Sequence, residues 1–481
     1  MTVPAPKLLI GGAFQDAASG ERIPVIDPST GEPLGELARG RAADVEAAVK
    51  AAKKALEGPW GRMTATERGR ILTRIAQGIL DRATDLAILE ARDVGKPHAQ
   101  AKADALACAR YFEFYGGAAD KVHGDTIPYQ AGYQVMTWYE PHGVTGHIVP
   151  WNYPMQIIGR SVGAALAMGN ACVVKPGEDA SLTALMIGKI ALEAGLPEGA
   201  LNIVTGYGEE AGAPLASHPD VAHVSFTGSV LVGQKIQEMA ARNVVPVTLE
   251  LGGKSPQLVF ADADLEAALP FLVRASVQNA GQTCSAGSRI LIEKPIWDEV
   301  VSALVERFSA LTVGPALDDP DVGPIVNGRQ RDRVKGFIER AEAGGARILA
   351  RGRVLDDAPA GGFYVAPALF GPVDAEAELA RDEIFGPVLS LIPFEGEDEA
   401  IAIANGTDFG LVAGVWTRDG GRQLRMAKRL RAGQVFVNNY GAGGGVELPF
   451  GGVGKSGHGR EKGFEALYGF AQLKTVAMKY E

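Results

Sequence analysis

The residue best suited to covalent chemistry is Cys284, which lies in the segment NAGQTCSAG (279–287). A segment so rich in Gly, Gln, Ser and Thr differs from the apolar interior in which cysteines are commonly buried. The chain has three cysteines, Cys108, Cys172 and Cys284, too few and too scattered for a disulfide framework or a zinc cluster. We therefore expect a reactive thiolate at Cys284, two core cysteines and a reducing cytoplasm.

Two turns have the composition of a dinucleotide-binding loop. GYGEEA (206–211) follows an apolar strand pattern and matches the G-x-G-x-x-G/A fingerprint, but no acidic residue is clearly placed about 20 positions later. A plain strand-to-helix turn explains it at least as well. FTGSVLVG (226–233) also follows a strand, and Gly228 and Ser229 could present backbone N–H groups and a hydroxyl to a pyrophosphate. Together the two turns predict a dinucleotide site without locating it.

Two Gly-Lys-Ser segments resemble the nucleotide-binding phosphate loop. That motif requires a glycine five positions before its Gly-Lys pair. Pro449 occupies this position for GGVGKS (451–456), and Thr248 occupies it for GKS (253–255). Hydrolysis of a nucleoside triphosphate is therefore not expected.

The elements that must position these segments alternate between strand and helix. Helical periodicity covers 42–56, 65–89 and 101–115, and 122–140 has a strand pattern. Between 143 and about 252, apolar strands alternate with helices, and a second such series covers about 262–437. This order predicts two doubly wound parallel sheets that bind ligands at the carboxyl ends of their strands.

Composition excludes several classes of protein. A chain of 481 residues that is 46% hydrophobic can bury large cores and is not disordered. A formal net charge of −10 argues against general nucleic-acid binding. The N-terminus lacks a secretory pattern, and the most apolar stretch, 161–174, is too short and too interrupted for a membrane span. We expect no metal, nucleic-acid or membrane partner.

Six segments, taken in order, point to a known family. They are PWNYP (150–154), VVKPGED (173–179), ELGGKSP (250–256), NAGQTCSAG (279–287), EIFGP (383–387) and LPFGGVGKSGHGRE (448–461). They resemble the non-acylating, NAD(P)-dependent aldehyde dehydrogenase superfamily over essentially the whole chain. The resemblance implies the α/β aldehyde dehydrogenase fold, oxidation of an aldehyde to a carboxylic acid, and NAD as cofactor with NADP as a second option.

The resemblance also assigns three catalytic roles. Cys284 would attack the aldehyde carbon and form a thiohemiacetal. Asn152 and the Cys284 backbone N–H would stabilise the oxyanion that forms. After hydride transfer, Glu250 would activate the water that hydrolyses the thioester. Relatives that transfer the acyl group to coenzyme A typically lack this glutamate, so hydrolysis is expected here.

The cofactor contacts follow from the same resemblance. Lys175 and Glu178 are similar to the residues that hold the adenosine ribose, and a carboxylate there would repel a 2′-phosphate and favour NAD. Glu383 and Phe385 resemble the contacts of the nicotinamide ribose and ring. In the family the FTGS turn, and not the GYGEEA turn, holds the pyrophosphate. The complete predicted cofactor set is Trp151, Lys175, Glu178, Gly208, Phe226, Gly228, Ser229, Leu251, Glu383 and Phe385.

Departures from the family pattern bear on the substrate. Val230 follows Ser229 where most relatives have threonine, and Ser161 replaces a common lysine. The resemblance places Arg160 in the substrate tunnel, where a guanidinium can clamp a carboxylate; alternatively, Arg160 pairs with an internal carboxylate. Gln278 stands where semialdehyde enzymes have a second arginine. With Tyr153, Arg160 and Gln278 as substrate residues, we expect a semialdehyde, hydroxyaldehyde or substituted aromatic aldehyde.

The predicted domains are an NAD-binding domain (1–122 and 142–252), a catalytic domain (253–455) and a bridging β segment (123–141 and 456–481). The bridging segment would join a neighbouring subunit in a homodimer or homotetramer. A coenzyme A-acylating enzyme and an inactive structural or binding relative are the alternatives. The presence of Cys284, Glu250 and Asn152 counts against both.

Overall fold

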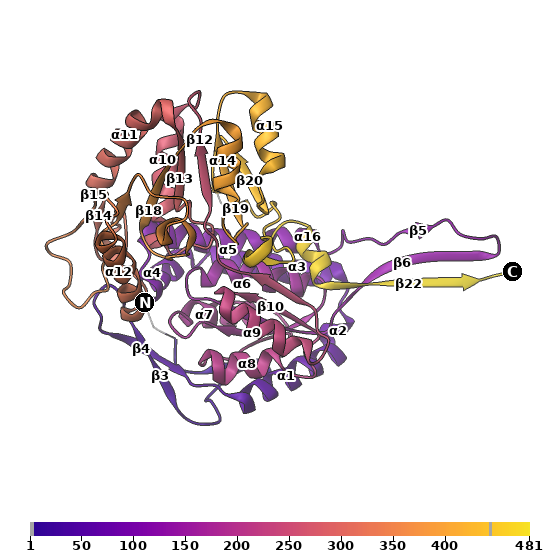
Figure 1. The fold of residues 1–481 in the computed structure, drawn as a ribbon. Coiled ribbons are helices and arrows are strands. Elements are labelled where there is room, and N and C mark those ends of the chain that lie inside the picture. The colour runs from indigo at the N-terminus through magenta and orange to yellow at the C-terminus, as the bar shows by residue number, and fades with distance from the viewer. Residues whose placement is uncertain (1–3, 442–444) are drawn as a thin grey trace.

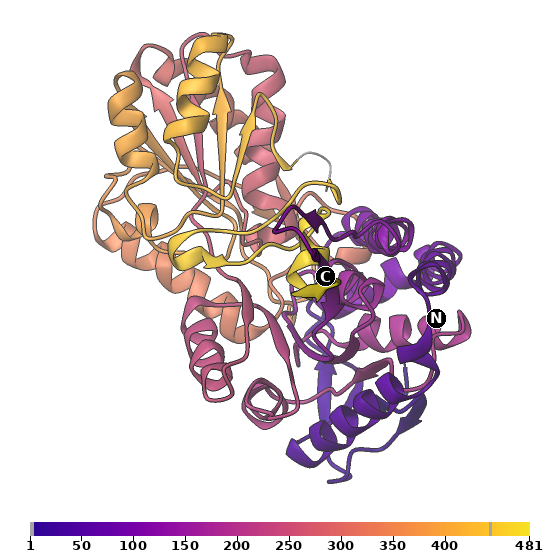
Figure 2. The ribbon, with the colours of Figure 1, turned by 90° about the vertical axis from the view of Figure 1, so that its right-hand side faces the viewer.

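The computed structural model describes residues 4–441 and 445–481. Figure 1 shows two α/β lobes and a long β arm that projects from the body, and Figure 2 shows the same lobes turned by 90°. Each lobe is built on its own mostly parallel sheet. The two alternating series of strands and helices in the sequence are thus confirmed as two sheets.

The first lobe contains an eight-stranded sheet of order β2-β1-β9-β8-β7-β10-β11-β21. The strands are β1 (Leu8–Ile10), β2 (Ala13–Gln15), β7 (Val144–Val149), β8 (Ala171–Pro176), β9 (Leu201–Ile203), β10 (His223–Thr227), β11 (Val247–Glu250) and β21 (Gly457–His458). The five strands from β9 to β11 are parallel. The chain runs outward from β7 to β9 and then returns to β10 beside β7. Ligands bind at the carboxyl ends of strands at such a reversal of order.

The helices of this lobe depart from the sequence prediction at one place. They are α1 (Ala42–Glu57), α2 (Pro59–Arg62), α3 (Ala65–Leu80), α4 (Ala83–Val94), α5 (His98–Ala118), α6 (Pro154–Ala167), α7 (Leu182–Glu193), η1 (Gly208–Gly212), α8 (Ala213–Ala216), α9 (Val230–Ala241) and α16 (Glu465–Gly469). The single helix predicted for 65–89 is wrong, because a turn at Asp81 and Arg82 separates α3 from α4. Apolar periodicity continues on both sides of the turn, and no Gly or Pro marks it. A hairpin of β3 (Arg22–Ile26) and β4 (Pro33–Ala38) lies beside this lobe.

The second lobe contains a seven-stranded sheet of order β15-β17-β18-β13-β12-β19-β20, in which only the β15 edge strand is antiparallel. The strands are β12 (Pro256–Val259), β13 (Arg289–Glu293), β15 (Ile348–Arg351), β17 (Ala368–Phe370), β18 (Val388–Phe394), β19 (Val412–Trp416) and β20 (Gln434–Val437). The helices are α10 (Leu265–Val277), η2 (Gln278–Gly281), η3 (Lys294–Ile296), α11 (Trp297–Ala310), η4 (Ala316–Asp318), α12 (Gly328–Ala343), α13 (Glu378–Arg381), α14 (Gly396–Ala404), α15 (Gly420–Arg429) and η6 (Gly454–Ser456). The short strands β14 (Thr312–Val313) and β16 (Arg353–Val354) pair with each other.

The arm is an antiparallel sheet of β5 (Thr126–Ile127), β6 (Tyr133–Pro141) and β22 (Ala471–Lys479), with β6 in the centre. Its tip carries the C-terminus far from both lobes (Figure 1). The segment 456–481 that was predicted to bridge subunits contains β21, α16 and β22. β21 belongs to the first sheet and α16 packs near α6, so only the β22 end of that segment lies in the arm.

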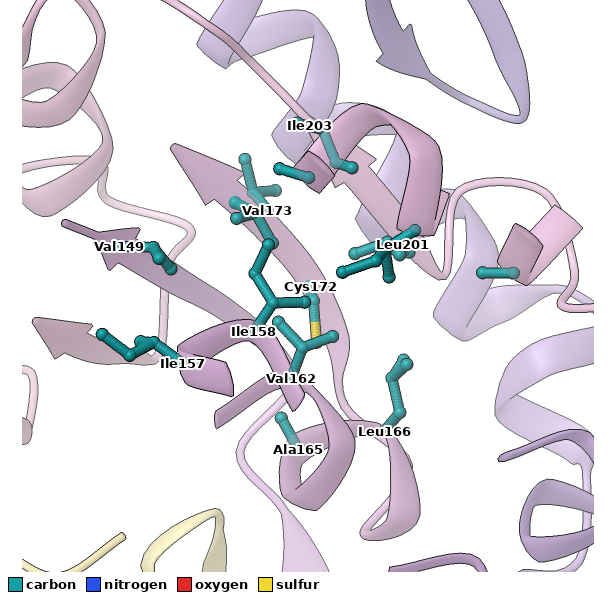
Figure 3. Packing of buried hydrophobic residues seen from close by; sticks show 14 of the residues in the cluster. Val149, Ile157, Ile158, Val162, Ala165, Leu166, Cys172, Val173, Leu201 and Ile203 are labelled. Carbon is teal, nitrogen blue, oxygen red and sulfur yellow. The ribbon is translucent and has the colours of Figure 1, made fainter. Parts of the chain in front are cut away.

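The core of the first lobe fixes the helix that follows β7. Figure 3 shows Ile158 and Val162 of α6 beside Cys172 and Val173 of β8, and Ile157 of the same helix towards Val149 of β7. Cys172 and Cys108 are fully buried, as expected for core cysteines. Each large apolar side chain contributes roughly 1.5–3 kcal/mol when buried. Nearly all of α6 is buried, including the polar residues Arg160 and Ser161. Packing of the apolar residues therefore fixes where these two side chains lie.

Candidate active site

A cavity of about 1510 Å³ is lined by residues of both lobes. The first sheet contributes segments at the carboxyl ends of β7, β10 and β11, and the second contributes loops before β13 and β18. Cys284, Glu250 and Asn152 all line this cavity. The structure therefore brings the three predicted catalytic residues to one place.

The loop that carries Cys284 has an unusual backbone. Asn279 and Ala280 have φ angles of 50° and 54°, in the left-handed region that residues with a Cβ rarely adopt. The Asn279 side-chain amide donates to the Asn152 carbonyl at 3.0 Å, and the Gln282 amide donates to the Asn279 carbonyl at 3.0 Å. The first bond joins the two lobes and the second lies within the loop, and together they hold its conformation. Strained backbone held in this way is common at functional sites.

The Asn152 side chain and the Cys284 thiol both line the cavity. The Asn152 Nδ2 donates to the Gln282 carbonyl at 3.0 Å, and an amide nitrogen carries a second N–H for another acceptor. Burial raises the pKa of Cys284 to about 11, although the Arg160 guanidinium opposes this shift. The thiol is therefore protonated at neutral pH and has to lose its proton to a base before it can attack.

Glu250 is the last residue of β11, and its side chain is buried, with a residue exposure of 1%. Among the described residues, neither carboxylate oxygen has a hydrogen-bond partner. Burial raises the pKa of Glu250 well above its ordinary value, and the Arg160 guanidinium only partly offsets this. A carboxylate with such a raised pKa is suited to accept a proton near neutral pH.

Tyr153 connects the Asn152 turn to the Cys284 loop. Its hydroxyl lies 2.9 Å from the Thr283 hydroxyl, in a hydrogen bond. The Lys96 ammonium lies 3.9 Å from the centre of the Tyr153 ring and is ion-paired with Asp104 and Glu90 in the interior. Tyr153 therefore packs on a buried charge cluster while it lines the cavity. Gln278, the other neutral residue predicted for the substrate, also lines the cavity.

The sequence left two alternatives for Arg160, a place in the substrate cavity or an ion pair with an internal carboxylate, and the structure shows both. Its guanidinium forms a buried ion pair with Glu461 and donates to the Thr227 hydroxyl at 3.0 Å. Glu461 also accepts a hydrogen bond from Ser225 at 2.6 Å. Arg160 lines the cavity, and its guanidinium carbon lies 5.2 Å from the centre of the Phe450 ring. The internal carboxylate partner is thus present, and the Arg160 charge is largely offset by it.

The two predicted nicotinamide-side residues lie at the cavity wall. Phe385 has a φ of 58° and its ring meets Trp151 edge-on, with the centres 5.4 Å apart. The Glu383 carboxylate accepts a hydrogen bond from the Gly253 backbone N–H at 3.0 Å, and burial raises its pKa to about 7. A Cβ at Gly252 would lie 2.2 Å from the other carboxylate oxygen. Only glycine at this position leaves Glu383 in place.

The predicted pyrophosphate turn begins α9. The Ser229 hydroxyl accepts a hydrogen bond from the Val232 N–H at 3.4 Å, so it caps the helix. A Cβ at Gly228 would lie 2.5 Å from the Phe226 ring, which explains the glycine. Gly228 and Ser229 line the cavity beside a helix N-terminus, which favours anions. Ser161, which stands where many relatives have lysine, donates its hydroxyl to the Ile157 carbonyl within α6.

The predicted adenosine end lies farther along the first sheet. The Lys175 ammonium pairs with the Glu178 carboxylate at 2.8 Å after β8. Burial raises the pKa of Glu178, but the Lys175 charge outweighs burial and holds this pKa below its ordinary value. The carboxylate is therefore anionic at neutral pH. Leu251 lines the main cavity, whereas Lys175, Glu178, Gly208 and Phe226 are not part of its lining.

Known proteins resemble this chain over its full length. The model of the aldehyde dehydrogenase family matches residues 14–476. A hydroxyisobutyraldehyde dehydrogenase of Mycolicibacterium austroafricanum is 42% identical over 482 residues, which cover 100% of this chain and 95% of the relative. The chain belongs to the aldehyde dehydrogenase family. The family predicted from the six sequence segments is thereby confirmed.

Solved structures agree with this aldehyde dehydrogenase fold. A Burkholderia cenocepacia protein described as an aldehyde dehydrogenase is 63% identical, with a TM-score of 0.98 over 99% of this chain and 100% of the other. An NAD+ complex of a Bacillus cereus aldehyde dehydrogenase is 38% identical, with a TM-score of 0.96 over 99% of this chain and 97% of the other. The predicted fold class is confirmed, and the protein is an oxidoreductase of the aldehyde dehydrogenase type.

Two site residues of this aldehyde dehydrogenase were not identified in the sequence. Glu461 and Lys462 follow the GGVGKSGHGR segment, which looked like a failed phosphate loop. Glu461 pairs with Arg160, and Lys462 lines the cavity. The signal available was the charged Arg-Glu-Lys sequence directly after a glycine-rich stretch, although it does not indicate which lobe these residues contact.

Over 4–441 and 445–481, no group of three or more His, Cys, Asp or Glu side chains could hold a metal ion. Over the same ranges, no helix combines the length and apolarity needed to cross a membrane.

Proposed function

We propose that this protein oxidises an aldehyde to a carboxylic acid with NAD+, through a covalent adduct on Cys284. The observation that carries the proposal is the presence of a thiol, an amide donor and a buried carboxyl group on the wall of one cavity. Formation of NADH with a panel of aldehydes, followed by absorbance, tests it. A preparation that forms NADH with none of them contradicts the proposal.

The residues support the following chemistry. Glu250 or water takes the proton of the Cys284 thiol and passes it to solvent, and the thiolate attacks the carbonyl carbon. The Asn152 amide and the Cys284 backbone N–H donate hydrogen bonds to the new oxyanion. Bound NAD+ would supply the acceptor for the hydride that leaves this carbon, and Glu383 and Phe385 would hold its nicotinamide end. Glu250 then takes a proton from water, which attacks the thioester and releases the acid and the thiol.

The lining of the site fits a dinucleotide. A helix N-terminus with Gly228 and Ser229 suits a pyrophosphate, and the Glu383 carboxylate suits ribose hydroxyls. The edge-on rings of Phe385 and Trp151 provide an aromatic surface against which the nicotinamide ring could pack. The first lobe is proposed as the NAD-binding domain and the second as the catalytic domain. Glu250 favours hydrolysis over transfer to coenzyme A, and its position in the cavity supports that preference.

We expect NAD+ to be preferred over NADP+ because the anionic Glu178 would face a 2′-phosphate. Glu178→Gln is expected to narrow the ratio of kcat/KM for NAD+ over NADP+ by about tenfold, since the repulsion between like charges is lost. Steady-state kinetics with both cofactors measure this ratio. Glu193→Gln, which breaks the exposed pair with Arg82, is the matched control. An unchanged ratio for Glu178→Gln would show that this carboxylate does not contact the ribose.

The arm is proposed to join copies of this chain in a homodimer or homotetramer. β22 is an edge strand, and Trp138, Leu473 and Met478 of the arm are 41%, 57% and 46% exposed. Exposed strand edges with apolar side chains favour pairing with another chain. Leu473→Glu is therefore expected to lower the molar mass in light scattering, whereas Leu424→Glu on α15, also an exposed leucine, leaves it unchanged. A monomeric native protein would contradict the proposal.

The proposed substrate is an aldehyde with a second polar group: a semialdehyde, a hydroxyaldehyde or a substituted aromatic aldehyde. Tyr153, Arg160 and Gln278 on the cavity wall support this class, and the Mycolicibacterium relative is named for a hydroxyaldehyde. Comparison of kcat/KM across aliphatic, aromatic, hydroxy and carboxy aldehydes tests it. A cytoplasmic location remains a prediction.

A further inference from the structure

Lys462 is held by the fold with its side chain at the cavity. It has a φ of 58°, a left-handed conformation that is uncommon for a residue with a long side chain. Both flanking residues are fixed by backbone hydrogen bonds. Glu461 exchanges two with Phe450, at 2.6 and 2.7 Å, and the Gly463 N–H donates to the Val446 carbonyl at 2.8 Å. The conformation of Lys462 is therefore imposed by its neighbours.

The Lys462 side chain shares an aromatic surface with Arg160. The Lys462 Nζ lies 5.0 Å from the centre of the Phe450 ring, and the Arg160 guanidinium carbon lies 5.2 Å from the same centre. The Lys462 Nζ is also 5.9 Å from the Tyr111 ring. Cations at such distances are attracted by the ring faces. Phe450 thus positions two cations on the wall that Cys284 and Glu250 also line.

The two cations are not equivalent. The Arg160 guanidinium is nearly fully buried, pairs with Glu461 and donates to Thr227. Lys462 is half-buried and lines the cavity, so its side chain can be reached from the space in which the aldehyde has to bind. An ammonium carries three donors on a flexible stem, whereas a guanidinium is a rigid, planar fork.

We propose that Lys462 binds a carboxylate carried by the aldehyde substrate, at the end opposite the carbonyl group that Cys284 attacks. This inference rests on the proposed function and narrows its substrate class to acidic aldehydes. Arg160 then supports the site by holding Glu461, the residue that precedes Lys462, and does not itself bind the substrate carboxylate. A charge-assisted hydrogen bond between the Lys462 ammonium and the substrate carboxylate provides the selectivity.

The experiment compares 4-carboxybenzaldehyde with benzaldehyde, which share the reacting group and the ring. Lys462→Met is expected to lower the ratio of kcat/KM for the acidic over the neutral aldehyde by about tenfold or more. Lys462→Arg keeps the charge and is expected to retain most of the ratio. The matched control is Lys455→Met, which removes an exposed lysine paired with Asp408 and leaves the ratio unchanged.

The pH dependence of the same ratio is a second measurement. Burial, with the nearby Arg160 charge, lowers the pKa of Lys462 to about 8. The ionisable groups that influence or face it are Arg160 of α6, Glu250 of β11, Cys284, Glu461 and Tyr111 of α5. Both aldehydes use the same thiol and base, so those titrations cancel in the ratio. The preference for the acid should be present below the pKa of Lys462 and lost above it, and Lys462→Met should remove this dependence.

The outcomes separate the two proposals. If the wild type oxidises neither aldehyde nor any other in the panel, the proposed function fails. If it oxidises aldehydes and Lys462→Met leaves the ratio unchanged, the inference about Lys462 is overturned. A ratio that falls in Arg160→Gln and not in Lys462→Met assigns the carboxylate to Arg160 and also overturns it. The inference about Lys462 is supported if Lys462→Met loses the preference for the acidic aldehyde and Lys462→Arg retains it.

Discussion

Cys284→Ala is expected to abolish aldehyde-dependent formation of NADH while NAD+ binding remains close to that of the wild type. Alanine cannot form the covalent adduct from which the hydride leaves, so the loss of kcat is about 10⁴-fold or more. The cavity wall that faces the cofactor is unchanged, because Glu383, Phe385 and Ser229 lie on other segments. Absorbance of NADH measures the first effect, and calorimetry with NAD+ measures the second.

The other two cysteines provide matched controls. Cys108 and Cys172 are fully buried in the first lobe and do not line the cavity. Cys108→Ala or Cys172→Ala removes one buried sulfur and is expected to reduce stability slightly without loss of turnover. If Cys284→Ala retains substantial turnover, the nucleophile lies elsewhere. If either control loses turnover as completely, the effect reports on folding and not on chemistry.

The site residues that could be predicted are those that lie in short segments with a recognisable sequence pattern. Asn152 follows a buried strand, Glu250 ends one, and Cys284 lies in a polar loop before another. A parallel sheet places the carboxyl ends of its strands at one edge, so alternation of strand and helix was enough to expect convergence. The resemblance to a family then supplied the partner from the second lobe.

Contacts between distant segments could not be predicted in this way. The Arg160–Glu461 pair joins α6 to a loop near the C-terminus. The sequence pattern around either residue does not indicate that the other is its partner. β21 is a two-residue strand that completes the first sheet, which is too short to give an alternating pattern. The break between α3 and α4 was missed for a related reason. Apolar spacing continues through the turn at Asp81, so periodicity alone indicates one helix.

Lys462 shows how a missed contact changes the functional interpretation. The sequence drew attention to Arg160 because of its position in the family pattern. The structure places a carboxylate against Arg160 and a second cation, Lys462, on the cavity wall. The residue that sets substrate preference is therefore proposed to be Lys462, which contacts the same Phe450 ring as Arg160, the residue first suspected.

Glu250→Gln is expected to separate the two halves of the reaction. Glutamine has the same shape but cannot accept a proton, so hydrolysis of the thioester slows by about 10²–10⁴-fold, the usual contribution of a general base. If another base, such as water, can deprotonate Cys284, hydride transfer is affected less. Rapid mixing should then show a burst of NADH close to one equivalent per site, followed by slow steady turnover. Equal loss in both phases would mean that Glu250 also serves as the base for the thiol.

Stability provides the control that distinguishes chemistry from structure. Burial raises the pKa of Glu250, and a carboxyl group whose folded pKa is raised loses its stabilising effect as the pH rises above its unfolded value of about 4.3. Glu250→Gln does not titrate, so its melting temperature at neutral pH should equal or exceed that of the wild type. Glu461→Gln leaves the buried Arg160 without its anionic partner and should cost about 3–5 kcal/mol.

We therefore expect Glu250→Gln and Glu461→Gln to differ in both the NADH burst and the thermal stability. Glu250→Gln combines a burst with undiminished thermal stability, because its carboxyl group has no hydrogen-bond partner among the described residues. Glu461→Gln combines reduced thermal stability with no burst, because water activation still belongs to Glu250. If Glu250→Gln instead melts early and turns over at the wild-type rate, Glu250 is a structural residue and another group activates the water.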